Sequence, residues 1–211
     1  DRSPSRGLGD VYKRQEIADT FIWKKKWDKV LDWDFDSVDI KWFENAKLNI
    51  TENILEKNLI DLADKTAIIW EPNDPTEPSI HLTYKELYEE TCKFSNALRE
   101  KGIKKGDRVI IYMPMVPEAA IAMLACARVG AVHSVVFAGF SSTSLADRIN
   151  DCQAKMVLTS DGNFRGNKTI PVKPVVDEAL EKCKTIESGV VLERTKQKIN
   201  MTSGRDFWWH D

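Results

Sequence analysis

Short apolar runs alternate with amphipathic segments along this chain of 211 residues, mainly between positions 49 and 192. Apolar residues at every third or fourth position predict helices, and short runs of aliphatic and β-branched residues predict strands. The expected helices are 49–61, 83–101, 117–129, 142–152 and 172–183, and the expected strands are 66–70, 80–82, 109–113, 131–137, 156–159 and 190–192. Strands that alternate with helices predict βαβ units, so the expected fold class is α/β, with a mostly parallel sheet flanked by helices.

Particular residues mark where these elements begin and end. Thr83-Tyr-Lys-Glu86 is a capping-box pattern, in which the hydroxyl and the carboxylate each bond a free backbone N–H. Gly102 is expected to end that helix. Pro117 begins the next helix, since proline suits a first helical turn. The run 131–137 is apolar almost throughout, which is typical of a parallel strand buried on both faces.

The first fifteen residues show neither a helical nor a strand period. Asp10-Val-Tyr-Lys-Arg-Gln15 is similar to a translated transposon-adapter sequence of the kind left in metagenomic assemblies. Residues 1–15 are therefore interpreted as an artefactual tail outside the fold. A natural disordered tail is the alternative, because chain ends are often disordered.

Residues 16–42 are rich in tryptophan, phenylalanine and charged side chains. Trp23, Trp27 and Leu31 are spaced at i, i+4 and i+8, which predicts one apolar face of a helix. An aromatic stripe of this kind is more often a packing surface than a ligand site. The segment is interpreted as an N-terminal extension that wraps on the main domain.

The charge balance and the cysteines narrow the class of protein. Lys and Arg number 31 against 33 Asp and Glu, so a net charge of −2 offers no basic excess for nucleic acid or a membrane surface. The longest apolar stretch, 119–127, is far shorter than the ~20 residues that a membrane-spanning helix needs. The four cysteines have no metal-ligand spacing, and they favour a reducing, cytoplasmic location.

Ligands of doubly wound sheets bind at the carboxyl ends of the strands, and two segments of suitable composition follow expected strands. The first is Phe137-Ala-Gly-Phe140, followed by Ser141 and Ser142. Its alanine and glycine leave backbone N–H groups open to a ligand. The alternative is an ordinary strand-to-helix turn with a serine at the helix N-cap, and the residues alone favour that alternative.

The second segment is Ser160-Asp-Gly-Asn-Phe-Arg-Gly-Asn-Lys168. Its glycines and asparagines allow unusual backbone angles. Arg165 and Lys168 bring two cations together on a loop, and such cations are common partners of phosphate. A solvated surface loop is the alternative, and two cations alone do not decide between the two interpretations.

Other candidates for chemistry are weaker. His133 lies in an apolar run and His210 follows two tryptophans, so both are interpreted as packed side chains. The sequence has no serine-hydrolase elbow, no zinc-peptidase motif and no P-loop motif. From the residues alone, the chain is an α/β domain with a candidate anion-binding loop.

A set of sequence blocks resembles the acetyl-CoA synthetases, a family of AMP-forming, adenylate-forming acid–CoA ligases. The block from Lys105 to Ser141 carries most of the resemblance, and its stretch from Tyr112 to Phe140 is specific to acetyl- and similar short-chain synthetases. The other blocks are Ile40–Phe43 with Leu48-Asn49, Asp64–Glu71, Leu82–Leu87, Leu145–Ile149, Thr159–Asp161, Arg165–Lys168 and Gly204–Asp211. Together they cover residues 20–211.

The resemblance implies an activity and its substrates. Acetate attacks the α-phosphate of Mg-ATP to give acetyl-adenylate and pyrophosphate, and the thiol of CoA then displaces AMP. The expected partners are therefore the small molecules acetate, ATP and CoA. Catalysis of this kind depends on positioning the reactants and neutralising phosphate charge.

The resemblance also places a CoA site on this chain. The family's Arg-x-Gly-Arg/Lys loop corresponds to residues 165–168, whose two cations would meet the phosphates at the nucleotide end of CoA. Residues 137–139 correspond to a stretch beside the CoA adenine. Asn167 stands where many relatives have glycine, and Ala138 stands where some relatives have glycine. These two differences leave the exact backbone contacts with CoA open. The implied CoA-binding residues are Phe137, Ala138, Gly139, Arg165, Gly166, Asn167 and Lys168.

The family's phosphate loop, acetate pocket, magnesium site and C-terminal lysine would lie beyond Asp211. The chain is therefore expected to be an N-terminal fragment without catalytic residues or metal ligands, inactive alone, with an incomplete sheet that has an unpaired edge. The expected organisation is the tail 1–15, the aromatic extension and helix 16–63, and a partial AMP-binding-type domain 64–211. Two alternatives stay open: a complete, non-catalytic CoA- or nucleotide-binding module, and a synthetase for a neighbouring acid such as propionate.

Overall fold

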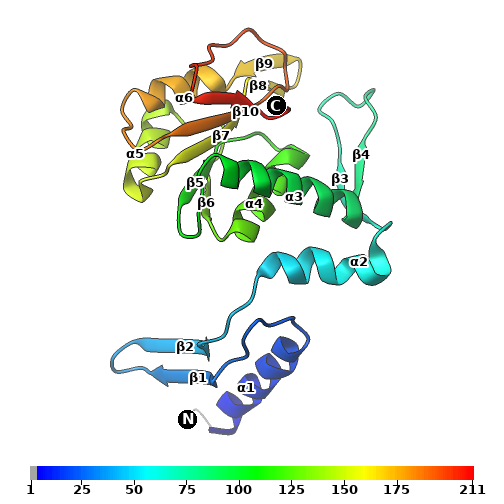
Figure 1. Ribbon diagram of the computed structural model, residues 1–211, viewed down its shortest axis with the longest axis vertical. Coiled ribbons are helices and arrows are strands. Elements are labelled where there is room, and N and C mark those ends of the chain that lie inside the picture. The colour runs from blue at the N-terminus through cyan, green and yellow to red at the C-terminus, as the bar shows by residue number, and fades with distance from the viewer. Residues whose placement is uncertain (1–3) are drawn as a thin grey trace. The chain divides into compact units, whose positions relative to one another are not determined.

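The computed structural model describes residues 4–211 of the chain, with side chains from residue 9 onward. The chain divides into two units, Asp1–Asn58 and Leu59–Asp211. The first unit contains helix α1 (Pro4–Asp19), an antiparallel hairpin of β1 (Lys29–Asp34) and β2 (Asp39–Glu44), and a π-helical turn η1 (Glu52–Glu56) (Figure 1). Helix α2 (Lys57–Leu62) continues from η1, so the helix predicted over 49–61 is confirmed.

Helix α1 occupies residues for which the sequence pattern predicts no regular structure. An ion pair between Arg14 Nε and Asp10 Oδ2 (3.0 Å) joins adjacent turns of this helix, and such i, i+4 pairs support a helix that has little apolar periodicity. The structure thus differs from the expected lack of order over 4–15. Residues 1–3 lie outside the described part of the chain, and the interpretation of 1–15 as an assembly artefact stays a prediction.

The aromatic residues after α1 do not form the predicted helical stripe. Trp23 and Trp27 lie in the connection between α1 and β1, and Leu31 lies on β1 itself. The helical prediction is wrong because β1 pairs along almost its whole length with β2, with Trp33 opposite Ile40. Cross-strand pairing overrides a local spacing that would equally suit a helix.

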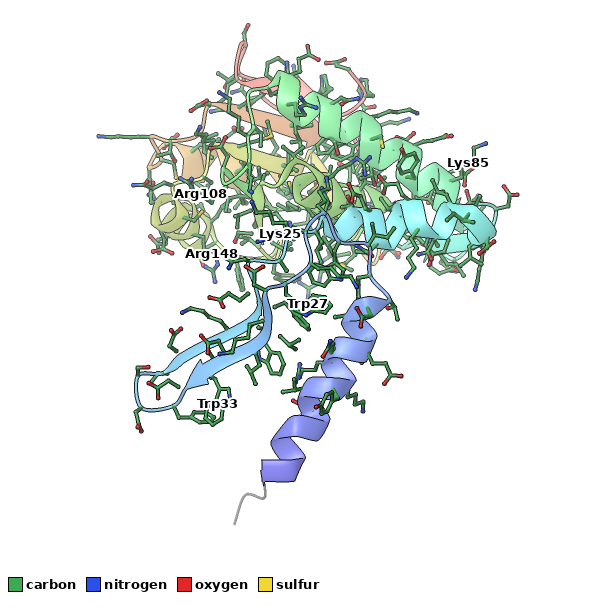
Figure 2. The ribbon with its side chains drawn as sticks, turned by 60° about the horizontal axis from the view of Figure 1, so that its bottom comes forward. Lys25, Trp27, Trp33, Lys85, Arg108 and Arg148 are labelled. Atoms are coloured by element: carbon green, nitrogen blue, oxygen red, sulfur yellow. The ribbon has the colours of Figure 1, made fainter. Side chains whose placement is uncertain are left out.

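The tryptophan rings nevertheless make a packing surface. The rings of Trp23 and Trp27 meet edge to face at 5.3 Å, and the ring of Phe43 lies 5.8 and 5.1 Å from them. Trp23 Nε1 donates a hydrogen bond to the carbonyl oxygen of Ala18 (2.7 Å). Figure 2 shows Trp27 at the base of the hairpin beside α1, and Trp33 farther along the hairpin. The expectation that this N-terminal extension wraps on the main domain stays a prediction.

The second unit is built on a five-stranded parallel sheet with the strand order β11-β10-β7-β5-β6. Its strands are β5 (Arg108–Ile111), β6 (Val132–Val135), β7 (Met156–Ser160), β10 (Ser188–Leu192) and β11 (Asp206–Trp208). Its helices are α3 (Tyr84–Glu100), α4 (Pro117–Val129), α5 (Ser142–Cys152) and α6 (Lys173–Leu180). Two antiparallel hairpins, β3 (Thr66–Trp70) with β4 (Ile80–Thr83) and β8 (Gly162–Arg165) with β9 (Lys168–Pro171), complete the unit. The α/β class with a parallel sheet flanked by helices is confirmed.

Strand β7 lies at the centre of the core, because each of its residues is buried. Alternate strand residues point to opposite faces of a sheet. Ile110 and Val157 pack in one cluster with residues of α5 and α6. Val109 and Leu158, which are fully buried, face the other side, where α3 and α4 lie (Figure 1). The sheet is therefore covered on both faces, as parallel sheets require.

Strand β6 differs from its prediction. It is shorter than the predicted 131–137, and Val132 and Val135 are each 55% exposed, so it is not buried on both faces. The reason is its position, since within the described residues β6 pairs only with β5 and forms an edge of the sheet. An apolar run predicts a strand, but burial depends on which strands and helices lie beside it.

A buried ion network joins α6 to β11. The Lys173 ammonium lies 2.6 Å from Asp177 Oδ1 and 2.9 Å from Asp206 Oδ2, and the side chains of Lys173 and Asp206 are 2% and 1% exposed. Arg205 contacts the same two carboxylates at 3.0 and 2.7 Å. Every charge in the group therefore faces an opposite charge, which burial demands.

The predicted helix signals are confirmed at α3. Thr83 Oγ1 accepts a hydrogen bond from the backbone N–H of Glu86 (3.1 Å), while Glu86 Oε2 accepts one from the N–H of Thr83 (2.8 Å). At the other end, Gly102 has the left-handed φ of +83° expected after a helix C-cap. Both ends of α3 are thus satisfied by residues that the sequence marks.

Thr83→Ala is expected to lower the free energy of unfolding of the chain by about 1 kcal/mol, because the N–H of Glu86 loses its acceptor. Urea unfolding followed by circular dichroism measures this change. Thr83→Ser retains a hydroxyl and is expected to stay close to the parent chain. An equal loss in both variants would contradict a capping role.

Candidate functional site

The carboxyl ends of β5, β6, β7 and β10 meet at one edge of the sheet because these strands are parallel. Ligands of open α/β sheets bind beyond this edge. Both segments singled out in the sequence leave strands there, since 137–140 follows β6 and 161–168 follows β7. The expected location of the candidate site therefore agrees with the fold.

The second segment is a hairpin rather than the predicted loop. Strands β8 and β9 pair from Gly162 opposite Pro171 to Arg165 opposite Lys168. The two residues between them are Gly166, with a φ of +56°, and Asn167, which is not among the residues with positive φ. A positive φ at the first central residue is the pattern of a type II′ hairpin turn, which favours glycine at that position.

Arg165 and Lys168 are directly opposite each other at the end of this hairpin. Side chains of opposed residues lie on the same face of a hairpin, with Cβ atoms roughly 5 Å apart. Both side chains belong to exposed residues, and neither forms an ion pair within residues 4–211. Like charges placed opposite each other cost stability, so the arrangement suits an external anion that binds both, such as a phosphate group.

Contacts from the loop after β3 and from the segment after β10 support the hairpin. Asn73 Nδ2 donates a hydrogen bond to the carbonyl oxygen of Gly166 (2.9 Å). The guanidinium of Arg194 lies 5.1 Å from the ring centre of Trp70 and 5.3 Å from that of Phe164. Such cation–π contacts stabilise an arrangement by roughly 0.5–1 kcal/mol each at partly exposed sites. These supporting residues are far apart in sequence, and no local pattern points to them.

Asp161 lies between β7 and β8 and is fully buried. Its carboxylate accepts hydrogen bonds from the backbone N–H groups of Gly162 (2.6 Å), Arg194 (2.8 Å), Thr195 (3.0 Å) and Gln197 (3.1 Å). Burial alone would raise the pKa of this carboxyl group, but the hydrogen bonds outweigh burial and hold the pKa below its ordinary value. Sequence reasoning missed this role, although an aspartate that follows a strand with an apolar start, Met156-Val-Leu158, is a signal that could have found it.

Gly162 is required by the close approach of the chain around Asp161. A Cβ atom at this position would lie 2.6 Å from Thr195 Oγ1 and 3.0 Å from the carbonyl oxygen of Ile170. The first distance is shorter than real Cβ contacts, and the second involves backbone that cannot rotate away. A glycine is therefore needed where the hairpin leaves the sheet.

The first segment, 137–140, forms a turn in which Phe140 N–H donates to the carbonyl oxygen of Phe137 (3.0 Å). The hydroxyl of Tyr112, the residue after β5, donates to the carbonyl oxygen of Phe140 (2.7 Å) and holds the turn near the end of that strand. Phe137 is 71% exposed, and a Cβ atom at Gly139 would lie 2.5 Å from its ring. The turn thus offers an open aromatic face with a small residue beneath it.

The same turn also has the features of an ordinary helix start. Ser141 is the N-cap of α5, and its hydroxyl accepts a hydrogen bond from Ser144 N–H (3.3 Å). Ala138 is half-buried against the core cluster. The geometry is therefore compatible with both interpretations of this segment. Because β5 lies between β6 and β7, the starts of the two candidate segments are about 10 Å apart, or two strand spacings.

The remaining candidates do not add a catalytic group. Burial lowers the pKa of His133, which is half-buried on β6, so its imidazole is neutral at pH 7. His210 stacks on the ring of Trp208 at 5.9 Å. Burial raises the pKa of the Cys126 thiol to about 12, which leaves it protonated and a poor nucleophile.

The described residues contain neither a metal-binding cluster nor a membrane-spanning helix. Within residues 4–211, no group of three or more His, Cys, Asp or Glu side chains is arranged to hold a metal ion. Among the described helices, none has the length and apolar character needed to cross a membrane.

Two family models match the chain. The model of the AMP-binding enzymes matches residues 55–210. The model described as the acetyl-coenzyme A synthetase N-terminus matches residues 15–54. The boundary between the two models lies close to the division between the structural units at Asn58 and Leu59.

Similar proteins include acetyl-coenzyme A synthetases of several bacteria. The protein of Bradyrhizobium diazoefficiens is 52% identical over 198 residues, which are 93% of this chain and 30% of that protein. The protein of Magnetococcus marinus is 50% identical over 189 residues, which are 90% of this chain and 29% of that protein. The chain therefore spans about 30% of the length of these relatives.

Among solved structures, the acetoacetyl-CoA synthetase from Streptomyces lividans superposes on the chain with a TM-score of 0.80. The match covers 90% of this chain and 28% of that structure, at 24% sequence identity. Such a likeness shows that the two share a fold. It does not extend to substrate, because one fold supports many functions.

Proposed function

This chain belongs to the AMP-binding enzyme family, and on that basis we propose that the whole protein is an acetate–CoA ligase that forms AMP. The match to an acetyl-coenzyme A synthetase N-terminus and the identity of about 50% to proteins of that name support acetate as the acid. The observation that carries a role for this chain is the opposed pair of cations, Arg165 and Lys168, at the carboxyl edge of the sheet.

The proposed reaction has two steps. An oxygen of acetate attacks the α-phosphorus of ATP, the bond to the β-phosphate oxygen breaks, and acetyl-adenylate and pyrophosphate form. The sulfur of CoA then attacks the acetyl carbon after losing its proton, and the bond to the AMP phosphate oxygen breaks. The products are acetyl-CoA, AMP and pyrophosphate.

In this scheme the chain contributes binding rather than bond making. Arg165 and Lys168 bind the phosphates at the nucleotide end of CoA, with Gly166 and Asn167 forming the turn between them. Phe137, Ala138 and Gly139 lie beside the adenine, for which the exposed ring of Phe137 offers a stacking face. Two cations that share one face, with no acidic partner among the residues that the structure describes, favour a phosphate ligand.

We assign neither the catalytic residues nor the magnesium ligands to this chain. Magnesium binds through oxygen ligands, usually one or two carboxylates together with substrate phosphates. When bound, the ion would neutralise charge on the phosphates of ATP; this chain holds and orients CoA.

An assay of the whole protein with ATP, CoA and a single acid tests the proposal. Acetyl-CoA, AMP and pyrophosphate are expected to appear in equal amounts with acetate. Propionate and acetoacetate, tested in parallel, are expected to give a kcat/KM at least about tenfold lower than acetate. One added methylene in a fitted pocket changes the kcat/KM by roughly 10- to 200-fold. A higher kcat/KM for propionate than for acetate would mean that propionate, and not acetate, is the preferred acid. ADP instead of AMP, or no acyl-CoA from any short-chain acid, would refute the proposed function.

A further inference from the structure

Two separate segments of the second unit meet at the side chain of Asp161. The β8–β9 hairpin begins at Gly162, whose N–H donates to Asp161 Oδ1 (2.6 Å). The segment after β10 donates the N–H groups of Arg194, Thr195 and Gln197 at 2.8–3.1 Å, and the Thr195 hydroxyl adds a bond of 3.0 Å to Oδ2. One buried carboxylate thus holds two chain segments that are more than thirty positions apart in sequence.

The backbone of Asp161 also holds the residues that follow β9, where the chain leaves the hairpin. Its carbonyl oxygen accepts hydrogen bonds from the N–H groups of Val172 and Lys173, both at 3.2 Å. Its own N–H donates to the carbonyl oxygen of Leu192 (3.0 Å). The first residue of β8 and the residue after β9 are therefore both tied to this one position.

The bonds to the segment after β10 also reach the middle of the hairpin. Because Asp161 fixes the backbone of Arg194, the guanidinium of that residue is held over the ring of Phe164 and over the ring of Trp70. Phe164 precedes Arg165 in β8, so this contact constrains the strand that carries Arg165, from the opposite face of the hairpin. The hairpin is constrained at its base by direct bonds and along its length by a side chain that Asp161 positions.

These bonds require a carboxylate rather than an amide. All five groups that point at the side chain are donors, and an ionised carboxylate only accepts. In Asp161→Asn, one of the two acceptors becomes an NH₂ group that faces other donors. The substitution replaces one oxygen by an NH₂ group of similar size. At either oxygen it removes bonds from the segment after β10, and at Oδ1 it also removes the bond from Gly162 at the hairpin base.

We propose that Asp161 is the positioning residue for the CoA-binding cations, and that it sets the place and direction of the Arg165–Lys168 pair without touching the ligand. The inference rests on the proposed function, because it concerns the same site. It adds Asp161, which lies at the base of the hairpin, to the residues that determine the affinity for the phosphates of CoA.

Kinetics of the whole protein with Asp161→Asn test the inference. The KM for CoA is expected to rise about tenfold, as the loss of one to two charge-assisted hydrogen bonds would give, while the KM values for ATP and acetate stay within about twofold. Asp107→Asn is the matched control. Asp107 also bonds a backbone N–H (Lys104, 2.8 Å) and a lysine (Lys155, 3.0 Å), but it precedes β5 and lies at the opposite edge of the sheet. Its KM for CoA is expected to match that of the parent.

A double-mutant cycle separates positioning from general damage to the fold. If Asp161 acts through the cations, Asp161→Asn should raise the KM for CoA far less in an Arg165→Ala background than in the parent. If Asp161→Asn does not fold, Thr195→Val is a milder variant, because it removes only the hydroxyl donor to Asp161. It is expected to raise the KM for CoA about two- to fivefold. An unchanged KM for CoA in the folded variants, full additivity in the cycle, or equal rises for all three substrates would each overturn the inference.

The proposed function can fail separately. Absence of acyl-CoA formation by the parent protein refutes the function, and direct binding of CoA then tests the positioning role by itself. Calorimetry of the parent and of Asp161→Asn is expected to show about tenfold weaker binding in the variant. Equal affinities, or no binding by the parent, would overturn the inference.

Discussion

Replacing Arg165 by alanine in the whole protein is expected to raise the KM for CoA about 10- to 100-fold, with little change in the KM for ATP or acetate. The side chain is exposed at the end of the β8–β9 hairpin, opposite Lys168 and without an acidic partner among the described residues. A hydrogen bond to a charged group contributes roughly 1.5–3 kcal/mol, which corresponds to this range. Steady-state kinetics with each substrate varied in turn measure the effect.

Two variants serve as controls for Arg165→Ala. Lys168→Ala should act in the same direction, since the two cations face the same side of the hairpin. Lys85→Ala removes an equally exposed cation from α3 (Figure 2) and is expected to leave the KM for CoA unchanged. A similar rise for ATP or acetate in Arg165→Ala, or an unchanged KM for CoA, would remove the hairpin from the CoA site.

Lys173→Met is expected to lower the free energy of unfolding of the chain at pH 7 by about 3–5 kcal/mol. The ammonium group is buried between Asp177 and Asp206, and its removal leaves Asp206 with only part of its compensating charge. Methionine has a similar volume, so the loss arises from charge rather than from a cavity. Urea unfolding of both proteins measures the difference. A change in the free energy of unfolding below about 1 kcal/mol would mean that Arg205 alone compensates the carboxylates of Asp177 and Asp206.

The same network has a defined pH dependence. Burial would raise the pKa of Asp206, but the hydrogen bonds from Arg205 and Thr202 and the Lys173 ammonium outweigh burial and hold the pKa below the ordinary 3.8. A lowered pKa in the folded state contributes stability that is present above about pH 4 and is lost as the pH falls through the folded value. The stability difference between the parent and Lys173→Met should therefore shrink in acid and stay constant from about pH 5 to 8.

The periodic elements of the second unit follow from the sequence because local signals agree with each other there. Thr83 and Gly102 mark the ends of α3, and Pro117 begins α4, as predicted. Strand β7, whose first three residues are apolar, is buried along its whole length at the centre of the sheet. Where capping, period and composition indicate the same element, tertiary structure does not need to override any of them.

The errors occur where distant segments decide the outcome. Trp23 and Trp27 have a helical spacing, but the pairing of β1 with β2 determines the backbone nearby. The segment after β7 appears as a loop because its strands are short and polar, and only cross-strand pairing reveals a hairpin. Asp161 acts on residues 33–36 positions away, and Asn73 contacts Gly166 across 93 positions. Reasoning from local windows cannot reach such contacts.

The order of strands in the sheet has a consequence for synthesis of the chain. Strands β5 and β6 leave the ribosome first and pair with each other, but β7, which covers the other side of β5, ends only at Ser160. At about 5–20 residues per second, that interval lasts roughly 1–5 s. Throughout it, strand β5 has one unpaired side, and an unpaired strand edge can pair with the strands of other chains.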